Sequence, residues 1–382
     1  MFDTPSPFYN EDHAAFRETV RRWVAAEVES YVTEWDEAGS FPRELYKSAA
    51  AIGLFSVGYP EEYGGIPTDQ FYRIIISQEI ARAGAGGLAA SLMSHSIGAP
   101  PIANAGSAEL KARVMPEIIS GEKISALAIT EPEGGSDVAN LRTRAVREGG
   151  NYIVNGSKTF ITSGMRADYY TVAVRTGGEG MGGISLLLIE RDTPGFTRTA
   201  LNRKMGWWCS DTATLHFDDC RVPVANLLGQ ENLGFLVIMQ NFNNERLGLA
   251  ASCIAFSQVC LDEATEYAKD RKTFGKPLIR HQVIQHKLVD MAMRIRASQA
   301  YLEMLSWRIE QGENPIADVC LLKNQATLTM EFCAREAVQI LGGAGYMRGS
   351  KSERIYREVR VNAIGGGAEE IMRNLAARQL GY

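Results

Sequence analysis

One glutamate in this 382-residue chain, Glu245, lies in an apolar segment, where a carboxylate needs either a chemical function or an oppositely charged partner. Glu245 and Arg246 interrupt an otherwise apolar segment, residues 235–260, whose hydrophobic spacing predicts a helix. Removing a charged pair from water costs free energy unless a partner or a function compensates for it. Glu245 is therefore a candidate general base. The alternative is an ordinary glutamate on a helix face with a cation beside it.

A second group of polar residues lies in the loop of residues 129–138. The hydroxyls of Thr130 and Ser136 can donate hydrogen bonds, and Gly134-Gly135 lets backbone N–H groups approach a ring or a phosphate closely. An ordinary polar loop before a hairpin would have the same composition. These residues alone leave both interpretations open.

Arg271 is a candidate phosphate ligand, because a guanidinium offers paired donors to phosphate oxygens. It also lies in a mixed charge run, residues 269–272, ahead of Gly275. A solvated charge at a helix end is therefore the alternative interpretation.

Several familiar binding signatures are broken in this sequence. The run from Gly343 begins like a dinucleotide fingerprint but has Arg348 at its sixth place and follows a helical segment. Residues 156–159 invert the P-loop order, and we expect them in a hairpin-like turn. The five histidines show no metal-ligand spacing and the six cysteines form no C-x-x-C pair, so we expect no metal site and reduced, unpaired thiols.

The composition is that of a soluble folded protein, with 45% hydrophobic and 22% charged residues. A net charge of −5 without a Lys/Arg block argues against nucleic acid as a partner. The first ten residues have no basic-then-apolar run, and no apolar stretch approaches the ~18 residues that would span a bilayer. We therefore expect no signal peptide, no membrane span and a cytoplasmic location.

These residues must be positioned by more than one structural unit, because single cores rarely grow past roughly 250 to 300 residues. Helical periodicity covers residues 11–122, and short β-branched and aromatic runs follow, including 152–154, 169–174, 184–189 and 214–217. Helical periodicity returns at about 235–270, 280–311 and 315–342. We expect an N-terminal helical domain (1–122), a central β-barrel or sandwich (123–235) and a C-terminal four-helix bundle (236–382).

Five segments, in the same order, resemble the acyl-CoA dehydrogenase family: residues 128–138, 155–164, 271–275 with Gln282, 339–346 and 363–373. The commoner layout in that family has its catalytic glutamate where this chain has Gly366. Long-chain and isovaleryl-CoA dehydrogenases carry it on a helix directly before an arginine, as in Glu245-Arg246. The chain resembles this subgroup most. The resemblance thus implies that Glu245 is the base, and that the backbone N–H of Gly366 stabilises the thioester oxygen.

The resemblance also implies FAD as the cofactor. The implied FAD-binding residues are Ile129, Thr130, Gly135, Ser136, Phe160, Ile161, Thr162, Arg271, Phe274, Gln282, Gln339, Gly342, Gly343, Ala368 and Glu370. The implied acyl-CoA contacts are Ser136, Asn243, Arg246, Gly366 and Gly367. Phe160, Asn243 and Ala368 depart from the family's usual Trp, Asp and Thr.

The expected activity is α,β-dehydrogenation of a fatty or branched-chain acyl-CoA to the trans-2-enoyl-CoA. Electrons would pass to an electron-transfer flavoprotein. The resemblance implies a homotetramer, a dimer of dimers, in which Gln282 and residues 339–343 contact the FAD of a neighbouring subunit. Residues 365–367 are all glycine, and the absence of a side chain beside the thioester would leave room for a bulky or branched acyl group. The alternatives are an acyl-CoA oxidase or monooxygenase on the same scaffold, and a non-catalytic homologue that binds flavin or acyl-CoA.

Overall fold

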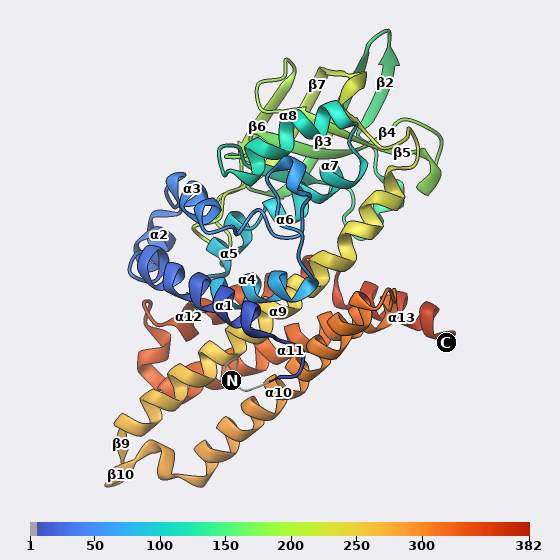
Figure 1. Ribbon diagram of the computed structural model, residues 1–382. Helices are drawn as coiled ribbons and strands as arrows, with labels where there is room; N and C mark the ends of the chain where they lie inside the picture. The colour runs from blue at the N-terminus through green and yellow to red at the C-terminus, as the bar shows by residue number, and fades with distance from the viewer. Residues whose placement is uncertain (1–5) are drawn as a thin grey trace.

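The computed structural model describes residues 6–382 and confirms the expected fold class, with helices first, a β sheet in the middle and helices last (Figure 1). The N-terminal part consists of α1 (Glu11–Val24), α2 (Val32–Ala38), α3 (Glu44–Ala51), α4 (Gln70–Ala81), α5 (Gly86–Leu92), α6 (His95–Gly98), α7 (Pro100–Ala105) and α8 (Ala108–Ile119). Asn10 begins α1 with a capping box: its side chain accepts from the N–H of His13 at 2.9 Å, and the His13 ring accepts from the N–H of Asn10 at 3.1 Å.

The middle part is one eight-stranded sheet in the order β6-β7-β3-β2-β4-β5-β8, with β1 pairing in parallel with β4. The strands are β1 (Ser125–Ala128), β2 (Arg144–Glu148), β3 (Asn151–Thr162), β4 (Tyr169–Arg175), β5 (Ile184–Glu190), β6 (Phe196–Ala200), β7 (Thr212–Pro223) and β8 (Leu227–Leu228). All four predicted β runs lie in strands. The ladder between β3 and β7 shifts register between Lys158 and Ile161, which marks a bulge.

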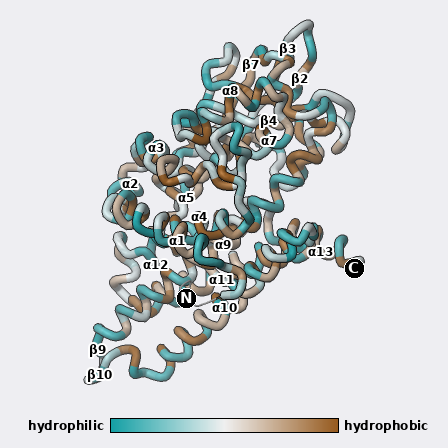
Figure 2. Tube along the Cα trace, in the orientation of Figure 1, coloured by the Kyte–Doolittle hydropathy of each residue, from teal (hydrophilic) through white to brown (hydrophobic). Residues whose placement is uncertain are grey.

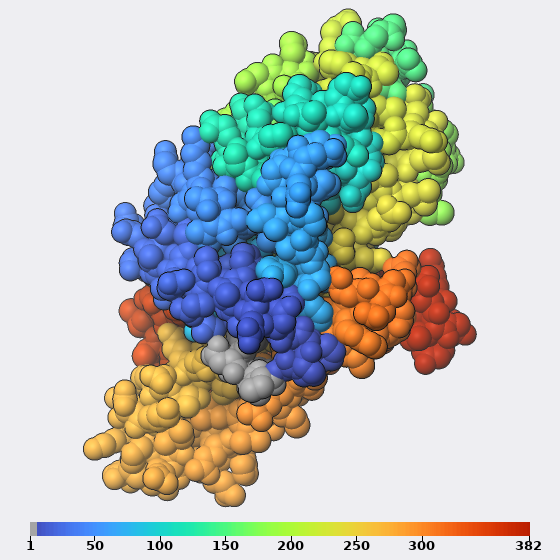
Figure 3. All heavy atoms as spheres, in the orientation of Figure 1, coloured from blue at the N-terminus to red at the C-terminus, as the bar shows by residue number. Residues whose placement is uncertain are grey.

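The C-terminal part contains α9 (Gly234–Asp270), α10 (Gln282–Glu310), α11 (Ile316–Leu341), α12 (Lys351–Ile364) and α13 (Glu369–Leu380). The three long helices that periodicity predicted are confirmed to within two residues at each end. A short hairpin, β9 (Lys272–Thr273) and β10 (Lys276–Pro277), links α9 to α10. In the space-filling view this end of α9 and α10 projects below the N-terminal helices (Figure 3).

The bundle core forms where α4 and α9 to α12 pack together. The hydropathy-coloured trace is brown around α4 and teal near β9, as expected for a buried face and a solvated tip (Figure 2). The six cysteines are buried and unpaired, as predicted.

One sequence expectation about apolar stretches is wrong. By length and composition alone, α9 contains an 18-residue window apolar enough to cross a membrane, and it is the one such helix among residues 6–382. However, 61% of that window is buried inside the protein. The apolar residues of α9 thus pack in the bundle core. A buried core helix and a membrane-spanning helix have similar apolar compositions.

Candidate active site

The structure brings Glu245 and Gly366 together, although 120 positions separate them in the chain. A methyl group placed on Gly366 would lie 3.9 Å from Glu245 Oε1 and 3.6 Å from Leu249 Cδ1. Glu245 projects from α9, and Gly366 lies in the turn between α12 and α13. The φ angles of Gly366 and Gly367 are 66° and 106°, a region that glycine adopts without strain. The turn can therefore present its backbone directly beside the carboxylate.

The environment of Glu245 disfavours the charged form of its carboxyl group. Its side chain is half-buried, but its Oε2 atom is shielded from water and has no hydrogen-bond partner among the described residues. Burial raises the pKa of Glu245 to about 7, and the cations of Arg246 and Lys323 hold it from rising further. A carboxyl group with this pKa is available as a base at neutral pH.

Two cations hold the glycine turn in place beside Glu245. Arg246 donates from Nε to the carbonyl of Gly366 at 3.0 Å and from Nη1 to Asn243 Oδ1 at 3.2 Å. Lys323, fully buried on α11, donates to the carbonyls of Gly367 at 2.8 Å and Ala363 at 3.3 Å. Sequence reasoning missed Lys323, although a lysine on the apolar face of the predicted helix at 315–342 was an available signal.

A second set of predicted residues meets at the bulge in β3. The N–H of Thr159 donates to the carbonyl of Thr130 at 2.8 Å, which places the loop of residues 129–138 against the strand. Phe160 has a φ angle of 57° and is 70% exposed, whereas Ile161 beside it is 3% exposed. A left-handed backbone at a bulky residue is strained, so the surrounding structure must hold it there.

The arrangement at the bulge fits a flavin. Phe160 offers an exposed aromatic face, and Thr130 and Thr162 offer hydroxyl groups in the same region. Gly135 approaches Thr130 closely, since an added methyl group would lie 3.2 Å from Thr130 Cγ2. In the same loop Ser136 is exposed and Ile129 is buried.

A buried ion pair that sequence reasoning missed shapes this loop. Lys158 Nζ donates to Glu131 Oε1 at 2.7 Å and to the carbonyl of Ile129 at 2.9 Å. Glu131 also accepts from the N–H groups of Arg142 and Thr143, at 2.5 and 2.8 Å. The expectation of a hairpin-like turn at residues 156–159 was wrong, because they lie inside β3. Lys158 can point inward there because Glu131 neutralises its charge.

The remaining predicted FAD residues lie elsewhere in this chain. Arg271, Phe274 and Gln282 are exposed near the hairpin of β9 and β10, at the end of α9 and α10 farthest from the sheet (Figure 1). Phe274 is 96% exposed and has a φ angle of 50°. The other members of the set are exposed Gln339, Gly342 and Gly343 at the end of α11, and half-buried Ala368 and exposed Glu370 beside the glycine turn. Within one chain, the predicted FAD residues thus lie in several separate groups.

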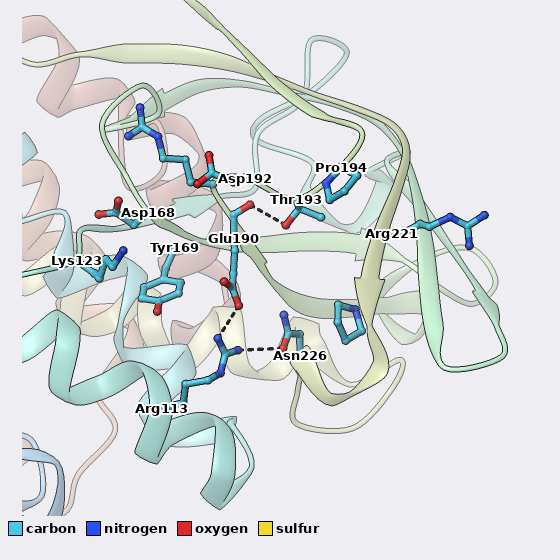
Figure 4. Close-up of a pocket in the computed structure, with 12 residues that line it drawn as sticks. Arg113, Lys123, Asp168, Tyr169, Glu190, Asp192, Thr193, Pro194, Arg221 and Asn226 are labelled. Carbon is cyan, nitrogen blue, oxygen red and sulfur yellow. Dashed lines mark hydrogen bonds and ion pairs between the residues drawn. The ribbon is translucent and has the colours of Figure 1, made fainter.

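One surface cleft lies apart from these residues. It has a volume of about 530 Å³ and lies between α8 and the sheet (Figure 4). Its Arg113 is already bound to Glu190 at 2.6 Å and to Asn226 at 3.3 Å. None of the predicted site residues lines it. The groups suited to chemistry gather instead around Glu245 and the β3 bulge.

Comparison with known proteins identifies the family across nearly the whole chain. The N-terminal, middle and C-terminal domain models of acyl-CoA dehydrogenases match residues 10–122, 126–220 and 232–381. The chain is 40% identical to acyl-CoA dehydrogenase AFT10-1 of Alternaria alternata, covering 99% of this chain and 94% of that protein. It is 37% identical to the mitochondrial long-chain specific acyl-CoA dehydrogenase of Sus scrofa, covering 97% and 87%.

Solved structures agree with the sequence comparison. An acyl-CoA dehydrogenase from Geobacillus kaustophilus matches with a TM-score of 0.96 and 36% identity, over 99% of this chain and all of that one. A glutaryl-CoA dehydrogenase from Mycobacterium smegmatis, solved in complex with FADH2, matches with a TM-score of 0.92 and 27% identity, over 99% and 96%. The chain therefore belongs to the acyl-CoA dehydrogenase family, whose members bind FAD and are oxidoreductases acting on CH–CH groups.

Proposed function

We propose that this protein dehydrogenates a fatty or branched-chain acyl-CoA between Cα and Cβ to give the trans-2-enoyl-CoA. The observation that carries this proposal is the position of Glu245: its carboxylate lies beside Gly366, where the chain has no side chain of its own to act as a base. The raised pKa of Glu245 supports the same role. The similarity to long-chain specific acyl-CoA dehydrogenases favours a fatty acyl chain.

Glu245 would take the α-proton of the thioester, and the backbone N–H of Gly366 would donate to the thioester oxygen as negative charge develops there. Arg246, Ser136 and Asn243 would bind the CoA moiety. The hydrogen bond from Arg246 to the carbonyl of Gly366 would also hold the glycine turn beside the base. Bound FAD supplies the acceptor for the hydride that leaves Cβ. The two electrons would then leave through an electron-transfer flavoprotein.

The separation of the predicted FAD residues supports a site shared between subunits. Residues near Thr130 and Phe160 would hold the flavin ring of one subunit's FAD. The exposed Arg271 and Gln282 would reach the FAD of a neighbour, with Arg271 on its phosphates. This requires an oligomer, and members of the family typically form tetramers.

An exposed apolar stripe on α10 supports such assembly. Val289, Met293, Met304 and Trp307 are 64%, 58%, 46% and 47% exposed, and their spacing puts them on one face of the helix. Large apolar side chains gathered on one helix face usually mark an interface. We propose that this face packs against other copies in a homotetramer, a dimer of dimers, located in the cytoplasm.

The direct test is anaerobic mixing of the purified protein with a panel of acyl-CoA esters of different length and branching. Bleaching of the flavin absorbance by an ester, with loss of bleaching in Glu245→Gln, would support both the reaction and the base. Full bleaching in Glu245→Gln would exclude this glutamate. Oxygen uptake without another acceptor would favour an oxidase or monooxygenase, and bound flavin that no ester bleaches would favour a non-catalytic homologue.

A further inference from the structure

A buried carboxylate outside the catalytic residues joins the three parts of the chain. Glu358, on α12, is 1% exposed. Its Oε2 accepts from the N–H of Gly86 at 2.7 Å, and its Oε1 accepts from the N–H groups of Gly87 at 3.3 Å and Trp207 at 3.2 Å. The two glycines begin α5, and Trp207 lies in the loop of residues 201–211 between β6 and β7. One side chain thus connects the N-terminal helices, the sheet and the C-terminal bundle.

The chain approaches itself closely at this junction. A methyl group on Gly86 would lie 2.5 Å from Trp207 Nε1 and 3.0 Å from Glu358 Oε2. A methyl group on Gly206 would lie 2.5 Å from the carbonyl oxygen of Arg357. Trp207 itself has a φ angle of 55°, which is strained for a bulky residue. The hydrogen bond from its N–H to Glu358 helps to hold that conformation.

An ion-pair network surrounds the same junction. Asp36, 2% exposed, binds Arg357 at 2.5 Å and Arg354 at 3.7 Å. The guanidinium of Arg357 lies over the ring of Trp208, 3.7 Å from its centroid. Asp36 also accepts from the N–H of Cys209, in the 201–211 loop, at 3.4 Å, but it touches none of the three N–H groups that Glu358 binds. It is therefore a control for the bonds by which Glu358 joins α5 to that loop.

The two segments joined by Glu358, α5 and the loop of residues 201–211, both form hydrogen bonds with Ser163, the residue after Thr162. The N–H of Ser163 donates to the carbonyl of Asp211, at the end of the 201–211 loop, at 3.0 Å. The hydroxyl of Ser163 donates to the carbonyl of Ser91, on α5, at 3.3 Å. The hydroxyls of Ser91 and Ser210 are 2.7 Å apart and bind each other. Ser163 is left-handed, with a φ angle of 60°, so it depends on these contacts.

We propose that Glu358 is a positioning residue for the flavin-facing segment of residues 160–163, acting by fixing α5 against the loop of residues 201–211. Its effect on the reaction rests on the proposed function, because only there does this segment meet the flavin ring. Its effect on FAD affinity does not depend on which acyl-CoA is oxidised. The alternative is that Glu358 only adds stability to the fold.

The test compares Glu358→Gln with Asp36→Asn in the full-length protein. An amide keeps the size of Glu358 but directs an NH2 group at backbone donors, so one or more of the three bonds must break. We expect the dissociation constant for FAD, from flavin fluorescence during titration of apoprotein, to rise about tenfold in Glu358→Gln. It should change less than about twofold in Asp36→Asn at a similar loss of stability. If Glu358→Gln fails to fold, the same measurement is made on Glu358→Asp. That variant retains the charge but has a side chain shorter by one methylene group.

A double-mutant cycle separates positioning from stability alone. Ser163→Ala should weaken FAD binding in the wild type, and that effect should largely vanish in the Glu358→Gln background, because the same contacts are already lost. Additive effects, or equal losses of FAD affinity in Glu358→Gln and Asp36→Asn, would overturn the proposal. These readouts use no acyl-CoA, so failure here differs from failure of the dehydrogenase assay.

Discussion

Replacing Glu245, the proposed base, by glutamine is expected to stabilise the FAD-free protein at alkaline pH. The folded protein raises the pKa of this carboxyl group from 4.5 to about 7, chiefly by burial. Between these two values the folded state binds a proton that the unfolded state releases. Stability therefore falls as pH rises from 4.5 to 7, and the full cost of the buried charge is present above pH 7.

The size of this effect follows from the pKa shift. Each pKa unit corresponds to about 1.4 kcal/mol, so the shift implies a cost of about 3 kcal/mol at pH 8 and almost none at pH 4.5. Glutamine is uncharged throughout this range and does not pay that cost. Glu245→Gln should therefore be more stable than the wild type by up to about 3 kcal/mol at pH 8, and the gain should fall to about 1 kcal/mol or less at pH 5.

The measurement is urea unfolding of FAD-free wild type and Glu245→Gln at pH 5 and pH 8. Glu266→Gln is the matched control, since it makes the same change on the same helix at a side chain that is 77% exposed. It should alter the free energy of unfolding by no more than about 0.5 kcal/mol at either pH. A Glu245→Gln protein whose stability relative to wild type does not depend on pH would refute the argument that Glu245 is held as a desolvated acid.

Three further perturbations test other contacts. Lys323→Met removes a cation that lowers the pKa of Glu245, so the pH profile of anaerobic flavin reduction should move to higher pH; an unmoved or lower midpoint would contradict this coupling. Lys158→Met leaves Glu131 buried without its partner and should cost about 3 to 5 kcal/mol in urea unfolding, and a loss below about 1 kcal/mol would show that the pair does not hold the loop. Met293→Glu places a charge in the α10 stripe and should shift the mass measured by light scattering toward smaller species, whereas the exposed Glu266→Gln should not; an unchanged mass would exclude this face from the interface.

Local sequence patterns determined the elements of this protein well. The apolar period of 3.6 residues predicted α9, α10 and α11, and β-branched runs predicted strands such as β4 and β5, because both signals arise from neighbouring residues that share one buried face. The same local signal could not tell a core helix from a membrane span in α9, since both environments select apolar side chains. Only its packing against the other helices decided that question.

Local patterns indicated buried charge at Glu245 and Arg246 but did not predict it elsewhere. Burial was not predicted for Lys158, Lys323 or Glu358, yet each is buried and bound to backbone groups of a distant segment. Whether a charge can be buried depends on donors or acceptors that arrive only when remote segments meet. The turn expected at residues 156–159 failed for the same reason, because Glu131 makes an inward lysine possible in a strand.

The sequence by itself determined the order of helices and strands, the resemblance to a family, and Glu245 as the candidate base. Only the tertiary structure decided that Glu245 and Gly366 share one place, and that Arg246 and Lys323 hold the turn between α12 and α13 beside them. The physical reason is that the two kinds of interaction join residues at different separations along the chain. Helix and strand formation depends on residues a few positions apart, whereas the electrostatics of a site depend on which groups the packed chain excludes from water together.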